Sequence, residues 1–187
     1  MKNIVLISLG ILFCITQLFS QDYDKVYLDS SDSTKYYYKV KPDVEAKGLL
    51  ILLPGCRGNS EWPLKTTKIP YIAADRGLVT IMIDYEIWLS WLRDDVLGLL
   101  NTSINHVIYE HEIPQDKCVI GGFSSGGNMA LSFAESALED SNTTAVVPRG
   151  VFALDPPLDL AELYSCDNQI LKGYYCLEKK KELQKKW

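Results

Sequence analysis

Residues 118–138 read CVIGGFSSGGNMALSFAESAL, and this segment tells more about the architecture than any other part of the chain. It opens with an apolar run, Cys118 to Ile120, which stops at two glycines and is typical of a strand buried on both faces. Small and apolar residues then recur at helical spacing from Ser125 to Leu138. The pattern predicts a strand that passes into a helix through one sharp turn at Ser124.

The turn contains the pattern Gly-x-Ser-x-Gly at Gly122, Ser124 and Gly126. Glycines on either side of the serine let the strand and the helix approach closely, and the bend exposes the hydroxyl at the end of the sheet. The backbone N–H of Ser125 lies at the N-terminus of the new helix, where it can stabilise an oxyanion. The short pattern is common by chance, so its weight comes from the strand before it and the helix after it. We therefore expect Ser124 to be a nucleophile and Ser125 to supply an oxyanion donor.

Further apolar runs without alternation occur on both sides of this segment, and each ends in turn residues. The runs are residues 49–53, 78–83 and 151–154. Helical spacing at residues 71–75 and 91–109 places helices between them. Residues 26–28 and 36–40 are rich in β-formers and flank a turn-rich segment, which predicts a hairpin. The predicted fold class is α/β, with a mostly parallel sheet flanked by helices and an N-terminal antiparallel hairpin.

Together these features resemble the α/β-hydrolase superfamily over residues 25–157. Residues 51–58, ILLPGCRG, resemble the third strand and the oxyanion loop of that fold. Residues 74–85 resemble its helix-to-fourth-strand segment, and Ser124 stands at the position of the nucleophile. The resemblance implies a serine hydrolase of the carboxylesterase, lipase or peptidase kind. It also implies a small-molecule ester or peptide substrate and no metal or organic cofactor.

The resemblance suggests roles for further residues. Where many esterases carry His-Gly-Gly, this chain has Pro54-Gly55-Cys56, so the backbone N–H of Cys56 or Arg57 would be the second oxyanion donor. Asp155 matches a place where some lipases of the superfamily keep their acid, although most members keep it one strand later.

No histidine occurs among the 63 residues after Ser124, although the triad order of this fold is serine, acid, histidine. His106 and His111 both precede the serine, at the end of the helix predicted over residues 91–109. That end of the helix meets the beginning of the next strand, and Ser124 follows the end of that strand. We therefore expect both histidines to be surface residues far from Ser124.

Only 32 residues follow Asp155, too few for two more crossovers of about 30 residues each. The predicted domain is therefore residues 21–157, a truncated α/β-hydrolase fold that lacks the last strands. Residues 158–187 have no buried apolar run and are expected to form a helical, basic tail. A sheet that ends at residues 151–154 exposes an apolar edge, so we expect the chain to be poorly soluble.

The N-terminus resembles a secretory signal peptide. A short positive head precedes a mostly apolar run from Ile4 to Phe19, and small Ser20 marks a cleavage site. The alternative is an N-terminal membrane anchor, because the run is only a little shorter than a membrane span. We expect residues 1–20 to be a signal peptide, the mature chain to be secreted or periplasmic, and no membrane contact to remain after cleavage.

Composition limits the function further. Of the 187 residues, 47% are hydrophobic and 23% are charged, which is typical of one globular domain. The net charge is −5 with no basic block, which argues against nucleic-acid binding. No Cys or His cluster has the spacing of a metal site, and pairing of Cys166 with Cys176 stays open, as does the oligomeric state.

Two functions remain. The first is serine hydrolysis at Ser124, with Asp155 as the acid and weak or no turnover by this chain alone, because a serine hydroxyl without a base is a poor nucleophile. The second is a catalytically inactive remnant, fragment or binding module that keeps the hydrolase fold and has lost the chemistry.

Overall fold

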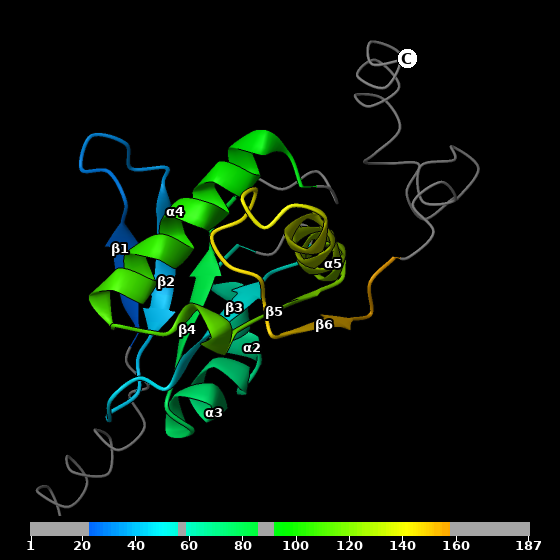
Figure 1. Cartoon of the computed structure of the whole chain (residues 1–187). Coiled ribbons are helices and arrows are strands. Elements are labelled where there is room, and N and C mark those ends of the chain that lie inside the picture. Colours follow the sequence, from blue (N-terminus) through cyan, green and yellow to red (C-terminus); the bar gives the residue numbers. More distant parts are fainter. Residues whose placement is uncertain (1–22, 56–58, 86–91, 158–187) are drawn as a thin grey trace, which may run out of the picture.

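The computed structural model describes residues 23–55, 59–85 and 92–157, and within these ranges six strands form one mixed sheet (Figure 1). The strands are β1 (Asp24–Tyr27), β2 (Tyr36–Val40), β3 (Gly48–Leu53), β4 (Leu78–Ile83), β5 (Cys118–Phe123) and β6 (Gly150–Leu154). The helices are α2 (Trp62–Thr66), α3 (Ile69–Asp75), α4 (Asp94–Glu110) and α5 (Ser125–Glu139), and a 3-10 turn, η1 (Gln115–Lys117), precedes β5. The strand order across the sheet is β1-β2-β4-β3-β5-β6.

Four neighbouring strands are parallel, and β1 and β2 add an antiparallel pair at one edge. β3 lies in the centre, where Ile51 is aligned with Ile81 of β4 and with Ile120 of β5. Leu154 of β6 is aligned with Phe123 of β5. The four parallel strands therefore end at one edge of the sheet, which is where open α/β sheets place their ligands.

Alternate residues of β3 divide the core into two layers, which explains why its apolar run has no alternation with polar residues. Leu49, Ile51 and Leu53 pack with residues of α4 and α5 on one face. Leu50 and Leu52 pack with residues of α2 and α3 on the other. The prediction of buried parallel strands with helices on both faces is therefore confirmed for β3, β4 and β5 (Figure 1). It is wrong for β6, the outermost described strand, which has no buried residue.

The predicted elements occur with small shifts. The hairpin strands, the strands of the three outer apolar runs and the helices near residues 71–75, 91–109 and 125–138 all form. The short helix α2 is a difference, because five residues beginning Trp62-Pro63 are too few to show a helical period. β5 continues past the apolar run through Gly121 and Gly122 to Phe123, as the predicted turn at Ser124 requires. A Cβ at Gly121 would lie 2.3 Å from the ring of Phe152, so this glycine makes room for packing inside the sheet.

Several expectations fall outside the described residues. These are the signal peptide at 1–20, the tail at 158–187, Cys56 and Arg57, and the pairing of Cys166 with Cys176. Among the described helices, none combines the length and the hydropathy that a membrane span requires.

Candidate active site

Ser124 is the single residue between the end of β5 and the start of α5. Its backbone has φ 48° and ψ −121°, a conformation that L-residues with a Cβ rarely adopt. Ser124 is exposed to solvent, although Gly122 before it and Ser125 after it are buried. Strained backbone of this kind persists only where the surrounding structure enforces it.

Two glycines enforce the turn. A Cβ on Gly122 would lie 2.4 Å from the backbone carbon of Gly126, and a Cβ on Gly126 would lie 2.3 Å from the carbonyl oxygen of Pro54. The end of β5, the first turn of α5 and the end of β3 therefore approach so closely that no side chain fits between them. The sequence analysis assigned this role to the glycines, and the structure adds Pro54 as the third partner.

Hydrogen bonds fix the orientation of the serine. The Ser124 N–H donates to the carbonyl oxygen of Leu154 at 2.8 Å, and the Ser124 carbonyl accepts from the N–H of Gly127 at 2.9 Å. Because the Ser124 N–H already donates to Leu154, it is not free to bind an oxyanion. The N–H of Ser125 lies in the first turn of α5, where the helix itself supplies no acceptor, as its predicted role as an oxyanion donor requires.

The side chain of Ser125 is a feature that the sequence analysis missed. The residue is only 3% exposed, and within the described part of the chain its Oγ has no hydrogen-bond partner. A buried hydroxyl without a partner costs free energy, on the order of 1–3 kcal/mol. No pattern in the sequence distinguishes it from an ordinary helix N-terminal serine.

Gly55 brings the chain after β3 against the serine. A Cβ on Gly55 would lie 3.2 Å from the Cβ of Ser124 and 3.1 Å from the carbonyl oxygen of Phe123. The resemblance placed an oxyanion donor immediately after this glycine, at Cys56 or Arg57. Both residues lie outside the described ranges, so that donor stays a prediction.

Asp155 lies beside Ser124 at the end of the next strand. It follows Leu154, whose carbonyl accepts the Ser124 N–H, and neighbouring strands are about 4.8 Å apart. Asp155 is exposed, and its φ of 52° makes it a second non-glycine residue with positive φ at this edge. The structure therefore brings Asp155 close to Ser124, without a hydrogen bond between the two side chains.

Neither histidine reaches the serine. His106 is on α4, and its Nδ1 lies 2.8 Å from the Tyr37 hydroxyl of β2. Two strands separate β2 from β5, which corresponds to about 14 Å across the sheet. His111 follows α4 near the start of β5, and the six residues of that strand rise about 20 Å before Ser124. Its Nε2 lies 3.6 Å from Glu110, and burial lowers the pKa of its imidazole.

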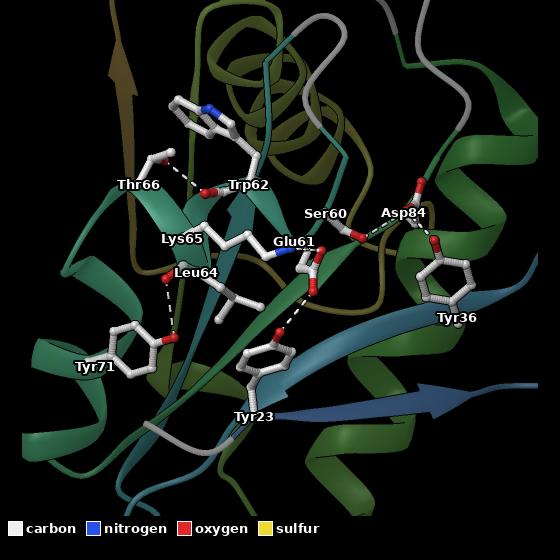
Figure 2. Close-up of polar contacts among 10 residues, drawn as sticks. All are labelled: Tyr23, Tyr36, Ser60, Glu61, Trp62, Leu64, Lys65, Thr66, Tyr71 and Asp84. Carbon is white, nitrogen blue, oxygen red and sulfur yellow. Dashed lines mark hydrogen bonds and ion pairs between the residues drawn. The ribbon is translucent and has the colours of Figure 1, made fainter. Parts of the chain in front are cut away.

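A polar cluster lies at the end of β4, next to this edge (Figure 2). The Asp84 carboxylate accepts hydrogen bonds from the hydroxyls of Tyr36, at 2.5 Å, and Ser60, at 2.9 Å. The adjacent Tyr85 donates its hydroxyl to the carbonyl oxygen of Pro54 at 3.1 Å. Both residues directly follow the apolar run at residues 78–83, and nothing in the sequence pattern predicts these contacts.

Within the described residues no group of three or more His, Cys, Asp or Glu side chains could hold a metal ion. Cys118 is buried at the start of β5, and its burial raises the pKa of the thiol to about 11. At the carboxyl edge of the parallel strands, the structure thus leaves the residue Ser124 exposed to solvent, whereas Cys118 at the opposite end of β5 is buried.

Comparisons with known proteins place this geometry in context. No protein-family model and no curated protein matches the sequence. Esterase B from Lactobacillus rhamnosis superimposes with a TM-score of 0.56 at 15% identity, over 93% of this chain and 64% of that protein. The fluorophosphonate-binding serine hydrolase FphF of Staphylococcus aureus, solved with substrate bound, gives 0.55 at 16%, over 78% of this chain and 61% of that protein.

An acetyl xylan esterase from Aspergillus awamori gives a TM-score of 0.51 at 15% identity, over 61% of this chain and 48% of that protein. The chain thus spans about half to two-thirds of the length of these three structures. A likeness at this level of identity establishes the fold.

Proposed function

We propose that this chain, which has the α/β-hydrolase fold, is a serine hydrolase that acts on esters or related acyl compounds through Ser124. The observation that carries the proposal is the strained, solvent-exposed turn at Ser124 between a central strand and a helix. Strain of this kind tends to occur at functional sites, and here it presents a hydroxyl beside the N-terminus of α5.

The chemistry follows from the geometry. The Oγ of Ser124 forms a bond to the substrate carbonyl carbon, and the carbonyl electron pair moves to its oxygen. The N–H of Ser125 stabilises that oxyanion, and the N–H of residue 56 is proposed as the second donor. Removing one such donor typically costs about 2.7–4 kcal/mol of transition-state stabilisation. The oxyanion then collapses, the bond to the alcohol breaks, and the alcohol leaves with the proton that Ser124 gave up. Water then attacks the acyl carbon, the bond to Oγ breaks, a proton of that water returns to Oγ, and the acid is released.

Removal of the proton from the Ser124 hydroxyl is expected to limit the rate of the reaction. Within the described residues no imidazole lies beside this hydroxyl, and Asp155 is the nearest carboxylate in the strand order. We propose Asp155 as the acidic member of the site. Because a serine hydroxyl without an imidazole beside it is a poor nucleophile, turnover by this chain is expected to be slow.

A fluorophosphonate probe tests the proposal. Attack by Ser124 forms an O–P bond, breaks the P–F bond, and releases fluoride and a proton. We expect stoichiometric labelling of the wild type and none of Ser124→Ala. Ser125→Ala is the matched control, because it keeps the backbone N–H of the proposed donor and loses only a hydroxyl. A folded wild-type sample that never labels contradicts the proposal.

A catalytically inactive binding module is the second candidate, and the placement of the two histidines favours it. The two functions differ in turnover. A hydrolase releases product from a nitrophenyl ester continuously and loses this activity in Ser124→Ala. An inactive module gives the same rate as Ser124→Ala.

We also propose that the chain is exported, with residues 1–20 as its signal peptide. Expression in a Gram-negative host, followed by N-terminal sequencing of the periplasmic fraction, tests this. We expect the mature protein to begin at Gln21. Recovery of the chain with Met1 intact in the membrane fraction would instead favour the anchor.

A further inference from the structure

The described part of the connection between β3 and α2, residues 54–55 and 59–61, is attached at two points to two consecutive residues of the chain. Its first residue, Pro54, accepts a hydrogen bond from Tyr85, and Ser60 near its end donates one to Asp84 (Figure 2 shows the second bond). Asp84 and Tyr85 directly follow β4, the strand that lies beside β3 in the sheet. We call these described residues, 54–55 and 59–61, the β3–α2 segment.

The attachment at Pro54 acts on the peptide that faces Ser124. Tyr85 is 6% exposed, and burial raises the pKa of its hydroxyl, so the group stays protonated and donates at any working pH. The carbonyl of Pro54 and the N–H of Gly55 belong to one planar peptide, so fixing the direction of the first fixes that of the second. The same carbonyl lies against Gly126, and Gly55 lies against Ser124.

The hydrogen bond of Ser60 holds the residues that lead directly into α2. Ser60 is fully buried, and the Asp84 oxygen that accepts its hydroxyl also accepts the Tyr36 hydroxyl from β2. Hydrogen bonds to a carboxylate are about twice as strong as those between neutral groups. Asp84 therefore links the β3–α2 segment to two strands of the sheet at one point.

We propose that Asp84 and Tyr85 are positioning residues that hold the β3–α2 segment in register with Ser124. The inference rests on the proposed function, since it assigns to this segment the placement of groups beside the reacting hydroxyl. Errors of about 1 Å in such placement can cost about a hundredfold in rate. Neither residue touches the reacting atoms, so each acts through the backbone it holds.

Single hydroxyl deletions test the proposal. Tyr85→Phe and Ser60→Ala each remove one attachment and leave the fold's apolar contacts unchanged. Tyr71→Phe is the matched control, because it also removes a tyrosine hydroxyl bonded to a backbone carbonyl, that of Leu64 at 3.2 Å, on helices α3 and α2. Ser60→Thr, which keeps a hydroxyl, is the conservative variant for rescue.

The measurement is the rate of fluorophosphonate labelling as a function of probe concentration. It gives a limiting rate and a half-saturating probe concentration. We expect Tyr85→Phe and Ser60→Ala to lower the limiting rate by about tenfold or more, with half-saturation changed by less than about twofold. Tyr71→Phe and Ser60→Thr are expected to label at close to the wild-type rate. If both deletions label like Tyr71→Phe, the positioning proposal is overturned while the proposed function stands.

Amide hydrogen exchange separates the remaining outcomes. If wild-type protein does not label, the proposed function fails, and exchange then decides the positioning role alone. We expect peptides that contain Gly55 and Ser60 to exchange faster in Tyr85→Phe and Ser60→Ala than in Tyr71→Phe, at equal global stability. Equal exchange in all three variants overturns the inference.

Discussion

At the level of single residues, the turn at Ser124 depends on the absence of a side chain at the neighbouring glycines. Gly122→Ala places a methyl group 2.4 Å from the backbone of Gly126, where only backbone can move to relieve the contact. We expect a loss of about 1–3 kcal/mol in the free energy of unfolding, measured by urea denaturation, together with loss of fluorophosphonate labelling.

Gly98→Ala is the control for this substitution. Gly98 is exposed on α4, and a Cβ there meets nothing within 4 Å. Alanine favours a helix interior over glycine, so this variant is expected to gain about 0.5–1 kcal/mol and to label normally. Equal stability of the two variants would show that the turn does not need Gly122.

At the level of elements, an ion pair joins α4 to the edge of the sheet. Lys39 of β2 is buried, and its Nζ lies 2.6 Å from Glu110 at the end of α4, whose carboxylate is partly exposed. Glu110→Gln leaves a buried ammonium without its counter-charge, whereas Lys39→Met removes the buried charge and leaves the carboxylate near water. We expect Glu110→Gln to cost about 1–2 kcal/mol, because water screens part of the interaction, and Lys39→Met to cost less.

The same pair predicts a dependence of stability on pH. Partial burial raises the pKa of Glu110, but the hydrogen bond and charge of Lys39 outweigh it, so the pKa lies below its ordinary value. A lowered folded-state pKa stabilises the protein above the unfolded-state value of about 4.3, and this contribution is lost as the pH falls through the folded-state pKa. The stability difference between wild type and Glu110→Gln should therefore shrink below about pH 4 in urea titrations. A difference that stays constant down to pH 3 would contradict the pairing.

At the level of the whole molecule, β6 is the outermost strand in the described part of the chain, and Val151 and Leu154 on it are each 41% exposed. Exposed apolar edge strands promote association between copies. We expect wild-type protein to associate as its concentration rises, and Val151→Lys to reduce this association, as measured by light scattering after gel filtration. Tyr109→Lys removes an apolar residue that is 88% exposed on α4, away from this edge, and is expected to change association less.

Across the whole molecule, some features of the fold and of the site are predictable from the sequence and others are not. The buried strands are predictable because runs such as residues 49–53 have no polar positions, and the turn at Ser124 is predictable because glycines flank it. The contact of Pro54 with Gly126 and the polar cluster at Asp84 were not predictable. They join residues that are distant in the chain, and no local period or turn pattern records such a contact.

The bond between Ser124 and Leu154 has a consequence for biosynthesis. The N–H of Ser124 finds its acceptor only on a strand that follows it by thirty residues. During translation, the bend can therefore close fully only after that later strand has emerged from the ribosome and docked. On the proposed function, we expect a nascent chain stalled before this point to carry a serine that a fluorophosphonate does not label.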